Sequence, residues 1–322
     1  MRFLIDGDPV HVCARSWLCA AALLWFFSRA LTFGTAMPAS LTSFRDDFLR
    51  LGLVPGDVVL ARAAYRAVGK PGAGGGDFLA ELLDFLGDHG TVACLAFTKG
   101  GFRWQASRLP PYTRATPSYA GALPNAMLAH PHARRSLHPQ CSFVAIGRHA
   151  RAITDDHGPD AGAYEPMRKL IALNAKMLVA GCVATNPGFT TTHLAEVDLG
   201  LHRRRIGRWF YISRYLDAQG RVRIFQRRDP GCCSNSYWKF YAEYVRHGIL
   251  TTGQVGNAYA ICAPARECYA IERAILARDS RFNLCGAPDC LTCNALRWDR
   301  IHRWPAWLAR RLLRSTHTGG TP

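Results

Sequence analysis

A histidine and a carboxylate stand three residues apart in the Thr-Thr-Thr-His-Leu-Ala-Glu stretch of residues 190–196. If 191–199 is helical, His193 and Glu196 share one face of the helix and can contact each other. An imidazole oriented by a second group is the usual arrangement of a general base. We predict that His193 accepts a proton and that Glu196 orients it or binds a substrate group. The alternative is a lone histidine of the core or surface, which is the commoner role.

Two further histidines stand near polar neighbours, His138 in Ser-Leu-His-Pro-Gln-Cys-Ser and His157 in Asp-Asp-His-Gly. Cys141 follows His138 closely, so a Cys–His nucleophile is conceivable. Packing of Cys141 in a strand is the preferred interpretation. The alternative for His157 is an ordinary loop residue that caps the next helix.

A glycine-rich loop, residues 69–76, comes just before an expected helix that opens at Asp77. Backbone amides at the start of a helix suit phosphate groups. Gly74, Gly75 and Gly76 are therefore candidate ligands of an anionic cofactor, although a glycine-rich loop alone is weak support.

Seven of the twelve cysteines lie between Cys232 and Cys293. A chain of 322 residues has core enough to fold without disulfides, so clustered thiols favour a metal. Cys285, Cys290 and Cys293 form a Cys-x4-Cys-x2-Cys run, whose second half can chelate a tetrahedral ion. Zinc with a structural role is the preferred metal, an iron–sulfur run starts in the same way, and unligated thiols are the alternative. The candidates for a fourth ligand are His302, Cys268, Cys232 and Cys233.

Short apolar runs alternate with amphipathic stretches along residues 41–182. This alternation is typical of an α/β fold in which helices cover both faces of a largely parallel sheet. Strands are expected at 57–63, 90–97, 142–147 and 176–182, with helices at 41–51, 77–87 and 121–130. Residues 209–226 predict a hairpin around 217–220, followed by a helix at 237–247, a strand at 255–262 and a helix at 264–278. Residues 297–315 predict an amphipathic helix.

The net charge is +17. It reflects either an arginine-rich codon bias or attraction to anions. No basic block or nucleic-acid-binding motif occurs in the sequence, so we expect no nucleic-acid partner. Residues 16–36 form an apolar stretch interrupted by Arg29, which indicates a start at Met37, a membrane anchor or a signal peptide, in that order. We expect a cytoplasmic protein, and whether it is a monomer or a homodimer stays open.

Four segments in order resemble the motifs of the aminoglycoside 3-N-acetyltransferase family, also called the antibiotic acetyltransferases. They are residues 51–64, 115–147, 176–198 and 253–262. The resemblance covers about residues 41–283, and the second and third segments are the most specific. It implies a single α/β sandwich domain over 37–283, after an N-terminal extension over 1–36 and before a cysteine-containing basic segment over 284–322. It also implies an acyltransferase that moves acetyl from acetyl-CoA directly to a small-molecule amine.

The resemblance assigns roles to residues at matching positions. His193 and Glu196 match the catalytic pair, Thr190 matches a hydroxyl that stabilises the oxyanion, and Asp198 matches an acidic substrate contact. His138 and His157 match histidines of the cleft and would bind substrate. Acetyl-CoA would be bound by the positions Arg62, Gly74, Gly75, Gly76, Thr98, Thr116 and Ser118.

The chain departs from the family pattern at the end of its first strand. Family members carry His-Ser-Ser or similar there, whereas this chain has Arg62, Ala63 and Ala64. An arginine can compensate at a phosphate; weaker CoA binding or a different acyl carrier are the alternatives. Because aminoglycosides are polycations and the chain is strongly basic, we expect a less cationic acceptor, such as an amino sugar or a natural-product amine.

Two other classes of protein compete with this interpretation. The first is a non-catalytic or repurposed relative that binds a CoA-like or anionic molecule. The second is a membrane-surface protein anchored by residues 16–36 and the basic C-terminal helix.

Overall fold

The computed structural model describes residues 44–69, 77–206, 210–229, 233–294 and 296–317. The predicted N-terminal extension lies outside these residues. No helix among the described segments is both long and apolar enough to cross a membrane.

A seven-stranded sheet with the order β10-β11-β7-β1-β2-β6-β5 forms the centre of the fold. Its strands are β1 Val58–Ala63, β2 Thr91–Leu95, β5 Arg134–Arg135, β6 Phe143–Gly147, β7 Lys176–Ala180, β10 Thr251–Val255 and β11 Ala258–Pro264. The central trio β7, β1 and β2 is parallel, while antiparallel pairings add the outer strands. Only β6 and β11 run against the other five strands, as expected for a largely parallel sheet.

Helices cover both faces of this sheet, because its central strands are apolar on both sides. In β1, Val58 and Leu60 join one core cluster and Val59 and Ala61 join the other, so the side-chain alternation of a strand feeds two cores. One cluster is closed by α2 Phe44–Arg50, α4 Phe78–Leu86 and α5 Ala122–Ala129. The other is closed by α6 Ala150–Thr154, α7 Glu165–Ala172, α8 Thr191–Asp198, α9 Tyr241–Arg246 and α10 Ala265–Arg278. These findings confirm the predicted α/β class.

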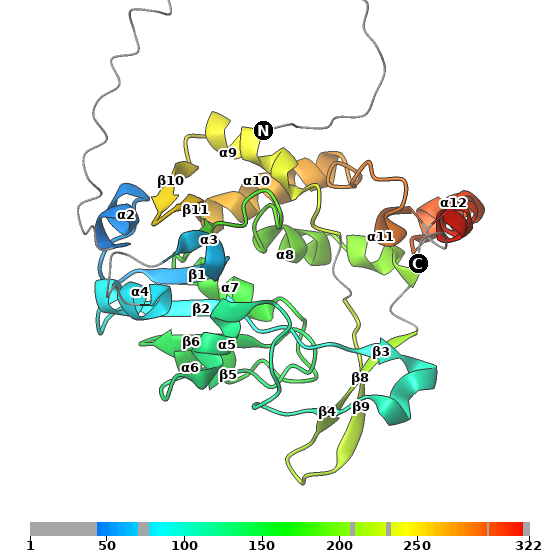
Figure 1. Ribbon diagram of the computed structural model, residues 1–322, viewed down its shortest axis with the longest axis horizontal. Helices are drawn as coiled ribbons and strands as arrows, with labels where there is room; N and C mark the ends of the chain where they lie inside the picture. The colour runs from blue at the N-terminus through cyan, green and yellow to red at the C-terminus, as the bar shows by residue number, and fades with distance from the viewer. Residues whose placement is uncertain (1–43, 70–76, 207–209, 230–232, 295, 318–322) are drawn as a thin grey trace, which may run out of the picture. The chain divides into compact units, whose positions relative to one another are not determined.

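A second, four-stranded sheet lies beside the first (Figure 1). It consists of β3 Gly101–Phe102, β4 Pro111–Tyr112, β8 Tyr211–Leu216 and β9 Val222–Gln226. Strands β8 and β9 are antiparallel and turn at 217–221, which confirms the hairpin expected from the sequence. Asp217 fixes this turn by accepting hydrogen bonds from the backbone amides of Gln219 and Arg221.

The strand expected at 255–262 is the second half of another hairpin, formed by β10 and β11. The turn contains Gly256, whose φ of 58° is left-handed and whose N–H donates to Asp47 at 2.8 Å. Strand β10 has the sequence Thr-Thr-Gly-Gln-Val, and its polar character concealed it in the sequence. Because β10 is the edge strand of the sheet, it needs few apolar residues.

The C-terminal segment contains α11 Leu291–Asn294, a 3₁₀ turn η5 at Trp298–Arg303 and α12 Trp304–His317. In Figure 1, α11 and α12 lie together, in orange and red. By its contacts this segment belongs to one compact unit with the rest of residues 42–322. The amphipathic helix expected near the C-terminus corresponds to α12.

Candidate active site

A cleft of about 370 Å³ opens where β1, β2 and β7 end. The carboxyl ends of parallel strands are where open α/β sheets bind ligands. Arg62 and Ala63 of β1, Leu95 of β2 and the loop after β7 contribute to its wall. A side pocket of about 250 Å³ adjoins it and shares the residues Phe97, Tyr119, His193 and Ser234. We call these cavities the main cleft and the side pocket.

His193 stands in the wall that the two cavities share, on the first turn of α8. Its ring stacks on Tyr164 with centroids 4.8 Å apart. Its Nδ1 lies 2.8 Å from the hydroxyl of Tyr237 and 3.5 Å from Oε2 of Glu196. Burial lowers the pKa of His193, against the opposing effect of Glu196. The ring is therefore neutral near pH 7, as a general base requires.

Glu196 lies behind His193 and is 3% exposed. Burial acts to raise the pKa of this carboxyl, but the charge of Arg205 and hydrogen bonds from His193 and Asn283 outweigh it and lower the pKa. Oε1 accepts from Arg205 at 3.4 Å and from Asn283 at 2.6 Å, while Oε2 accepts from Tyr237 at 3.3 Å. Glu196 is thus a carboxylate that faces the histidine rather than the cavity.

Thr190 and Arg62 occupy the main cleft, as the sequence led us to expect. Thr190 precedes α8 and is 6% exposed. Arg62 donates to the backbone oxygen of Gly188 and lies 3.5 Å from Oδ1 of Asn186. Its buried Nε has no hydrogen-bond partner within the described protein. A guanidinium in the wall of a cavity fits an anionic or carbonyl-bearing ligand.

Arg227 brings a second guanidinium to the side pocket. It lies over the ring of Tyr164, with the guanidinium carbon 5.4 Å from the centroid. Its Nε is 3.6 Å from the carboxylate of Asp229, and its buried Nη2 has no hydrogen-bond partner among the described residues. Nearby acidic groups raise the pKa of Arg227 despite its burial. Among the described residues that line either cavity, none is Asp or Glu.

His138 and His157 were predicted to contact substrate, and the structure corrects this. They are 0% and 1% exposed and stack on each other with centroids 4.8 Å apart. His138 Nδ1 accepts from the backbone N–H of Cys141 at 2.9 Å, and His157 is held by Ser136 and the backbone oxygen of Gly162. Neither histidine lines the main cleft or the side pocket. Both shape the loop that ends at Cys141, whose buried thiol has a pKa raised to about 11 by burial.

Asp198 also differs from its predicted role as a substrate contact. It stands at the far end of α8, pairs with Arg168 and accepts from the hydroxyl of Tyr269. Asp198 follows His193 by five residues on α8, is bound to α7 and α10, and does not line either cavity. Its role here is to hold three helices together.

The hydroxyls predicted to bind the cofactor are engaged in turns. Thr116 Oγ1 accepts from the amide of Thr113 at 2.9 Å, and Ser118 Oγ donates to the backbone oxygen of Phe97 at 3.0 Å. Thr98 lines the side pocket but donates to the backbone oxygen of Pro139. These residues build the rim rather than offer free donors. Gly74, Gly75 and Gly76 lie outside the described residues.

The three cysteines proposed as metal ligands gather in space, and a fourth joins them. The thiol sulfurs of Cys233, Cys285, Cys290 and Cys293 all lie within 4.8 Å of one another. Cys233 was one of the four candidates for the additional ligand. We call this set the four-cysteine cluster.

Sequence reasoning missed several residues of the site, namely Tyr164, Arg205, Arg227, Ser234, Tyr237 and Asn283. Tyr237 is 44 residues from His193, and Asn283 is 87 residues from Glu196. No local motif marks them, because each reaches the site through tertiary packing. The clustered cysteines are the one sequence signal near them: Tyr237 lies four residues after Cys233, and Asn283 lies two residues before Cys285.

Solved structures of aminoglycoside acetyltransferases share this fold. The apoenzyme of AAC(3)-IVa superposes with a TM-score of 0.65 at 22% identity, over 79% of this chain and 94% of that one. AAC-IIIb, solved as a binary complex with CoASH, has a TM-score of 0.62 at 25% identity, over 77% of this chain and 99% of that one. The fold is that of the solved AAC(3) acetyltransferases.

Sequence comparison identifies the family to which the chain belongs. Residues 60–277 match the aminoglycoside 3-N-acetyltransferase family, and the chain belongs to it. Aminoglycoside N(3)-acetyltransferase III of Serratia marcescens is 31% identical over 228 residues, 66% of this chain and 78% of that protein. Aminoglycoside N(3)-acetyltransferase VII of Streptomyces paromomycinus is 32% identical over 180 residues, 49% of this chain and 60% of that protein. The protein is an acyltransferase, as the resemblance implied.

Proposed function

We propose that this protein moves an acetyl group from acetyl-CoA directly to the amine of an acceptor less cationic than an aminoglycoside, with His193 as general base. The observation that carries the proposal is the place of His193 in the wall between two adjoining cavities. A base at such a junction can reach an amine in one cavity while the acyl donor occupies the other. Relatives named as aminoglycoside acetyltransferases, and one solved with CoASH, support the reaction class.

The hydrogen bonds around His193 favour a proton-accepting Nε2. The carboxylate of Glu196 can only accept, so the hydroxyl of Tyr237 donates to it. The Tyr237 oxygen then accepts from Nδ1–H of His193 at 2.8 Å. This assignment leaves a lone pair on Nε2. The proton of the attacking amine would pass to Nε2, and the positive charge that forms on the ring would be stabilised by Glu196.

Thr190 and Arg62 are the proposed contacts of the acyl donor. Acetyl-CoA supplies an activated thioester, whose carbonyl oxygen gains negative charge as the amine attacks. The hydroxyl of Thr190, beside His193 at the start of α8, is a donor suited to that charge. The guanidinium of Arg62, which lines the main cleft, is the proposed substitute for the donors lost at Ala63 and Ala64. The sulfur–carbon bond breaks as the new carbon–nitrogen bond forms, and the thiol leaves with a proton.

The charge of the cavities is the basis for the proposed acceptor. Both cavities contain an arginine and, among their described lining residues, no carboxylate. A polycationic aminoglycoside would meet Arg227, which pairs with Asp229, and no carboxylate of the cavity lining that could bind its ammonium groups, which costs affinity. An amino sugar or natural-product amine with a single amino group, or one that also bears an acidic group, suits this environment better.

A turnover assay of acetyl-CoA with a panel of amines tests the proposal. The panel contains aminoglycosides, neutral amino sugars and acidic amino sugars, and the acetylated product is identified by mass. We expect turnover with a neutral or acidic amino sugar, and a loss of kcat of roughly 100-fold or more in His193→Ala. His247→Ala, at an exposed position after α9, is the matched control and should retain activity.

The same assay distinguishes the proposed acetyl transfer from the alternative, a non-catalytic relative that binds a CoA-like ligand without turnover. Ala63 and Ala64, in place of two hydroxyls, favour that alternative. Binding of acetyl-CoA in calorimetry without turnover of any amine would contradict the proposed reaction. Preference for a polycationic aminoglycoside over every neutral amine would contradict the proposed acceptor.

A further inference from the structure

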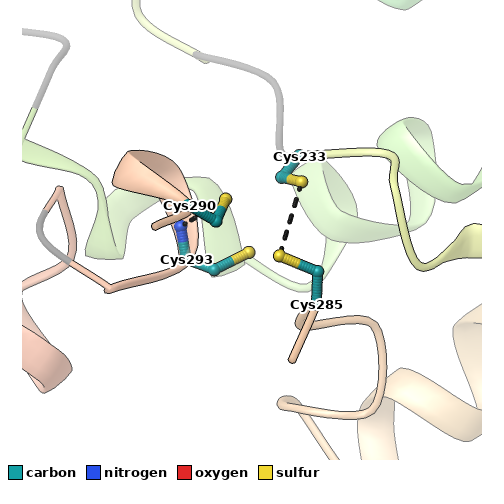
Figure 2. A group of neighbouring side chains, drawn as sticks. All are labelled: Cys233, Cys285, Cys290 and Cys293. Carbon is teal, nitrogen blue, oxygen red and sulfur yellow. Dashed lines mark hydrogen bonds between the residues drawn. The ribbon is translucent and has the colours of Figure 1, made fainter. Parts of the chain in front are cut away.

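The four-cysteine cluster joins two distant segments of the chain. Cys233 precedes the 3₁₀ turn η4 Tyr237–Phe240, whereas Cys285, Cys290 and Cys293 follow α10. Figure 2 shows the thiols of Cys233 and Cys285 facing those of Cys290 and Cys293 across a small gap. The cluster lies outside both the main cleft and the side pocket, so the proposed reaction does not use it.

The spacing of the sulfurs fits a single tetrahedral ion. With Zn–S bonds of about 2.3 Å, tetrahedral geometry places each pair of sulfurs roughly 3.8 Å apart. The sulfurs of Cys233 and Cys285 are 3.8 Å apart. A disulfide would bring them to about 2.05 Å. A polynuclear iron–sulfur cluster would hold its thiolates farther apart, because several iron and sulfide atoms lie between them, whereas all four sulfurs here lie within 4.8 Å.

The surroundings of the cluster hold its ligands in place. The backbone N–H of Cys293 donates to the sulfur of Cys290 at 3.4 Å, a bond that stabilises a metal-bound thiolate. Asn294 donates to the backbone oxygens of Ala287 and Cys290 and so closes the turn between them. Arg300 donates to the backbone oxygen of Cys293 at 2.9 Å, and its charge opposes the net negative charge of four thiolates around a divalent ion.

The apolar core of this region is small. Among the described residues, its buried members are Leu284, Cys285 and Cys293, with Cys233 and Cys290 partly buried beside them. Segments with so few buried apolar side chains commonly depend on a metal for their fold, because ligation energy replaces hydrophobic burial. Its other contacts include hydrogen bonds from Lys239 Nζ to the backbone oxygens of Phe282 and Leu284, at 3.1 and 3.0 Å, and ion pairs of Asp299 with Arg204 and Arg281.

Both joined segments supply residues to the site around His193. Ser234 follows Cys233 directly and lines both cavities, and Tyr237 contacts His193. Asn283, two residues before Cys285, donates to Glu196 at 2.6 Å. Ser236 ties the segments together by donating to the backbone oxygen of Asn283. An ion at the cluster would therefore fix the partners of both His193 and Glu196.

We propose that the four-cysteine cluster binds one structural Zn²⁺ ion. The ion positions the two segments whose Tyr237 and Asn283 contact His193 and Glu196. The cysteines are positioning residues, since none of them lines a cavity described above. The positioning role rests on the proposed acetyl-transfer function, but the metal site itself does not.

Elemental analysis of the full-length protein, purified under reducing conditions, tests the metal site. We expect one zinc per chain, and its loss from Cys285→Ser and Cys290→Ser. Cys268→Ala is the matched control: this buried cysteine of α10 was a candidate ligand but lies outside the cluster, so the variant should keep its zinc. Replacement of zinc by Co²⁺ should produce the absorption bands of a tetrahedral cobalt–thiolate site.

Measurements on the wild-type protein alone can contradict the proposed metal site, so the test does not depend on the folding of the cysteine variants. Four free thiols without metal, two disulfides in the intact mass, or stoichiometric iron would each contradict it. For the positioning role, removal of zinc by a chelator should lower kcat at least 10-fold and expose residues 283–294 to protease. Full activity after zinc loss would contradict that role. Zinc binding without acetyl transfer in the intact protein would instead contradict the proposed function and leave the metal site standing.

Discussion

At the scale of single residues, two buried glutamates of this protein have opposite pKa directions. Glu196 is surrounded by Arg205, Asn283 and Tyr237, and its pKa lies below the ordinary value although burial acts to raise it. For Glu272, burial raises the pKa to about 8 in spite of hydrogen bonds from the hydroxyls of Tyr244, Thr192 and Thr191. Glu196 is therefore a stable carboxylate beside the histidine, whereas Glu272 is a buried group that titrates near neutral pH.

The raised pKa of Glu272 predicts that the free energy of unfolding depends on pH. In the folded protein it keeps its proton up to about pH 8, while in the unfolded chain it loses it near pH 4.5. The folded state binds more protons in this window, so the free energy of unfolding falls as pH rises from about 5 to 8. The slope from this group is at most about 1.4 kcal/mol per pH unit.

Urea denaturation between pH 5 and 8.5 measures this effect. Glu272→Gln should flatten the slope, because an amide does not titrate. Glu267→Gln, at an exposed position of the same helix, should keep the wild-type slope. Equal slopes in the wild type and Glu272→Gln would show that Glu272 does not titrate in this range.

At the scale of elements, the loop after β7 approaches η4 so closely that only glycine fits. Gly188 has a φ of +79°, and a Cβ added there would lie 2.1 Å from Cβ of Tyr237. Its backbone oxygen accepts from Arg62 and its N–H donates to the hydroxyl of Tyr241 at 2.6 Å. One residue thus sets the spacing between the main cleft and η4, whose Tyr237 contacts His193.

Gly188→Ala should displace Tyr237 and with it the contact to His193. We expect a loss of about 100-fold in kcat, since small displacements of catalytic groups have effects of that size. Overpacking should also lower the free energy of unfolding by about 1–3 kcal/mol. Gly248→Ala is the matched control, because Gly248 also has a positive φ, +66°, but nothing lies within 4 Å of the added Cβ. If both variants lose kcat equally, backbone strain rather than crowding is the cause.

At the scale of the whole molecule, the sequence predicts local features well and long-range contacts poorly. The alternation of apolar strands and amphipathic helices led to the α/β class, and the spacing of His193 and Glu196 placed them correctly on one helix. The burial of His138 and His157 could not be predicted, because a histidine in a loop motif looks alike whether it faces a cavity or the core. Tyr237 and Asn283 escaped for a related reason: only the packing of distant segments brings them to Glu196.

The whole-molecule charge and the local charge agree in this protein. A net charge of +17 accompanies cavities that contain Arg62 and Arg227 but, in the part of the chain described, no acidic lining residue. The expectation of a less cationic acceptor was drawn from composition alone. The lining of the cavities gives it a local physical basis, because affinity for a polycation depends on the charges that it meets in the site.

The pH dependence of kcat/KM for acetyl transfer tests the central claim, that His193 takes the proton, most directly. This quantity reports the ionisation of the free enzyme, and burial lowers the pKa of His193 below 6.5. The account predicts that wild-type activity is constant near neutral pH and falls tenfold per unit on the acid side, below pH 6.5. It also predicts that the residual activity of His193→Ala lacks this acid limb. An unchanged acid limb in His193→Ala would contradict the claim.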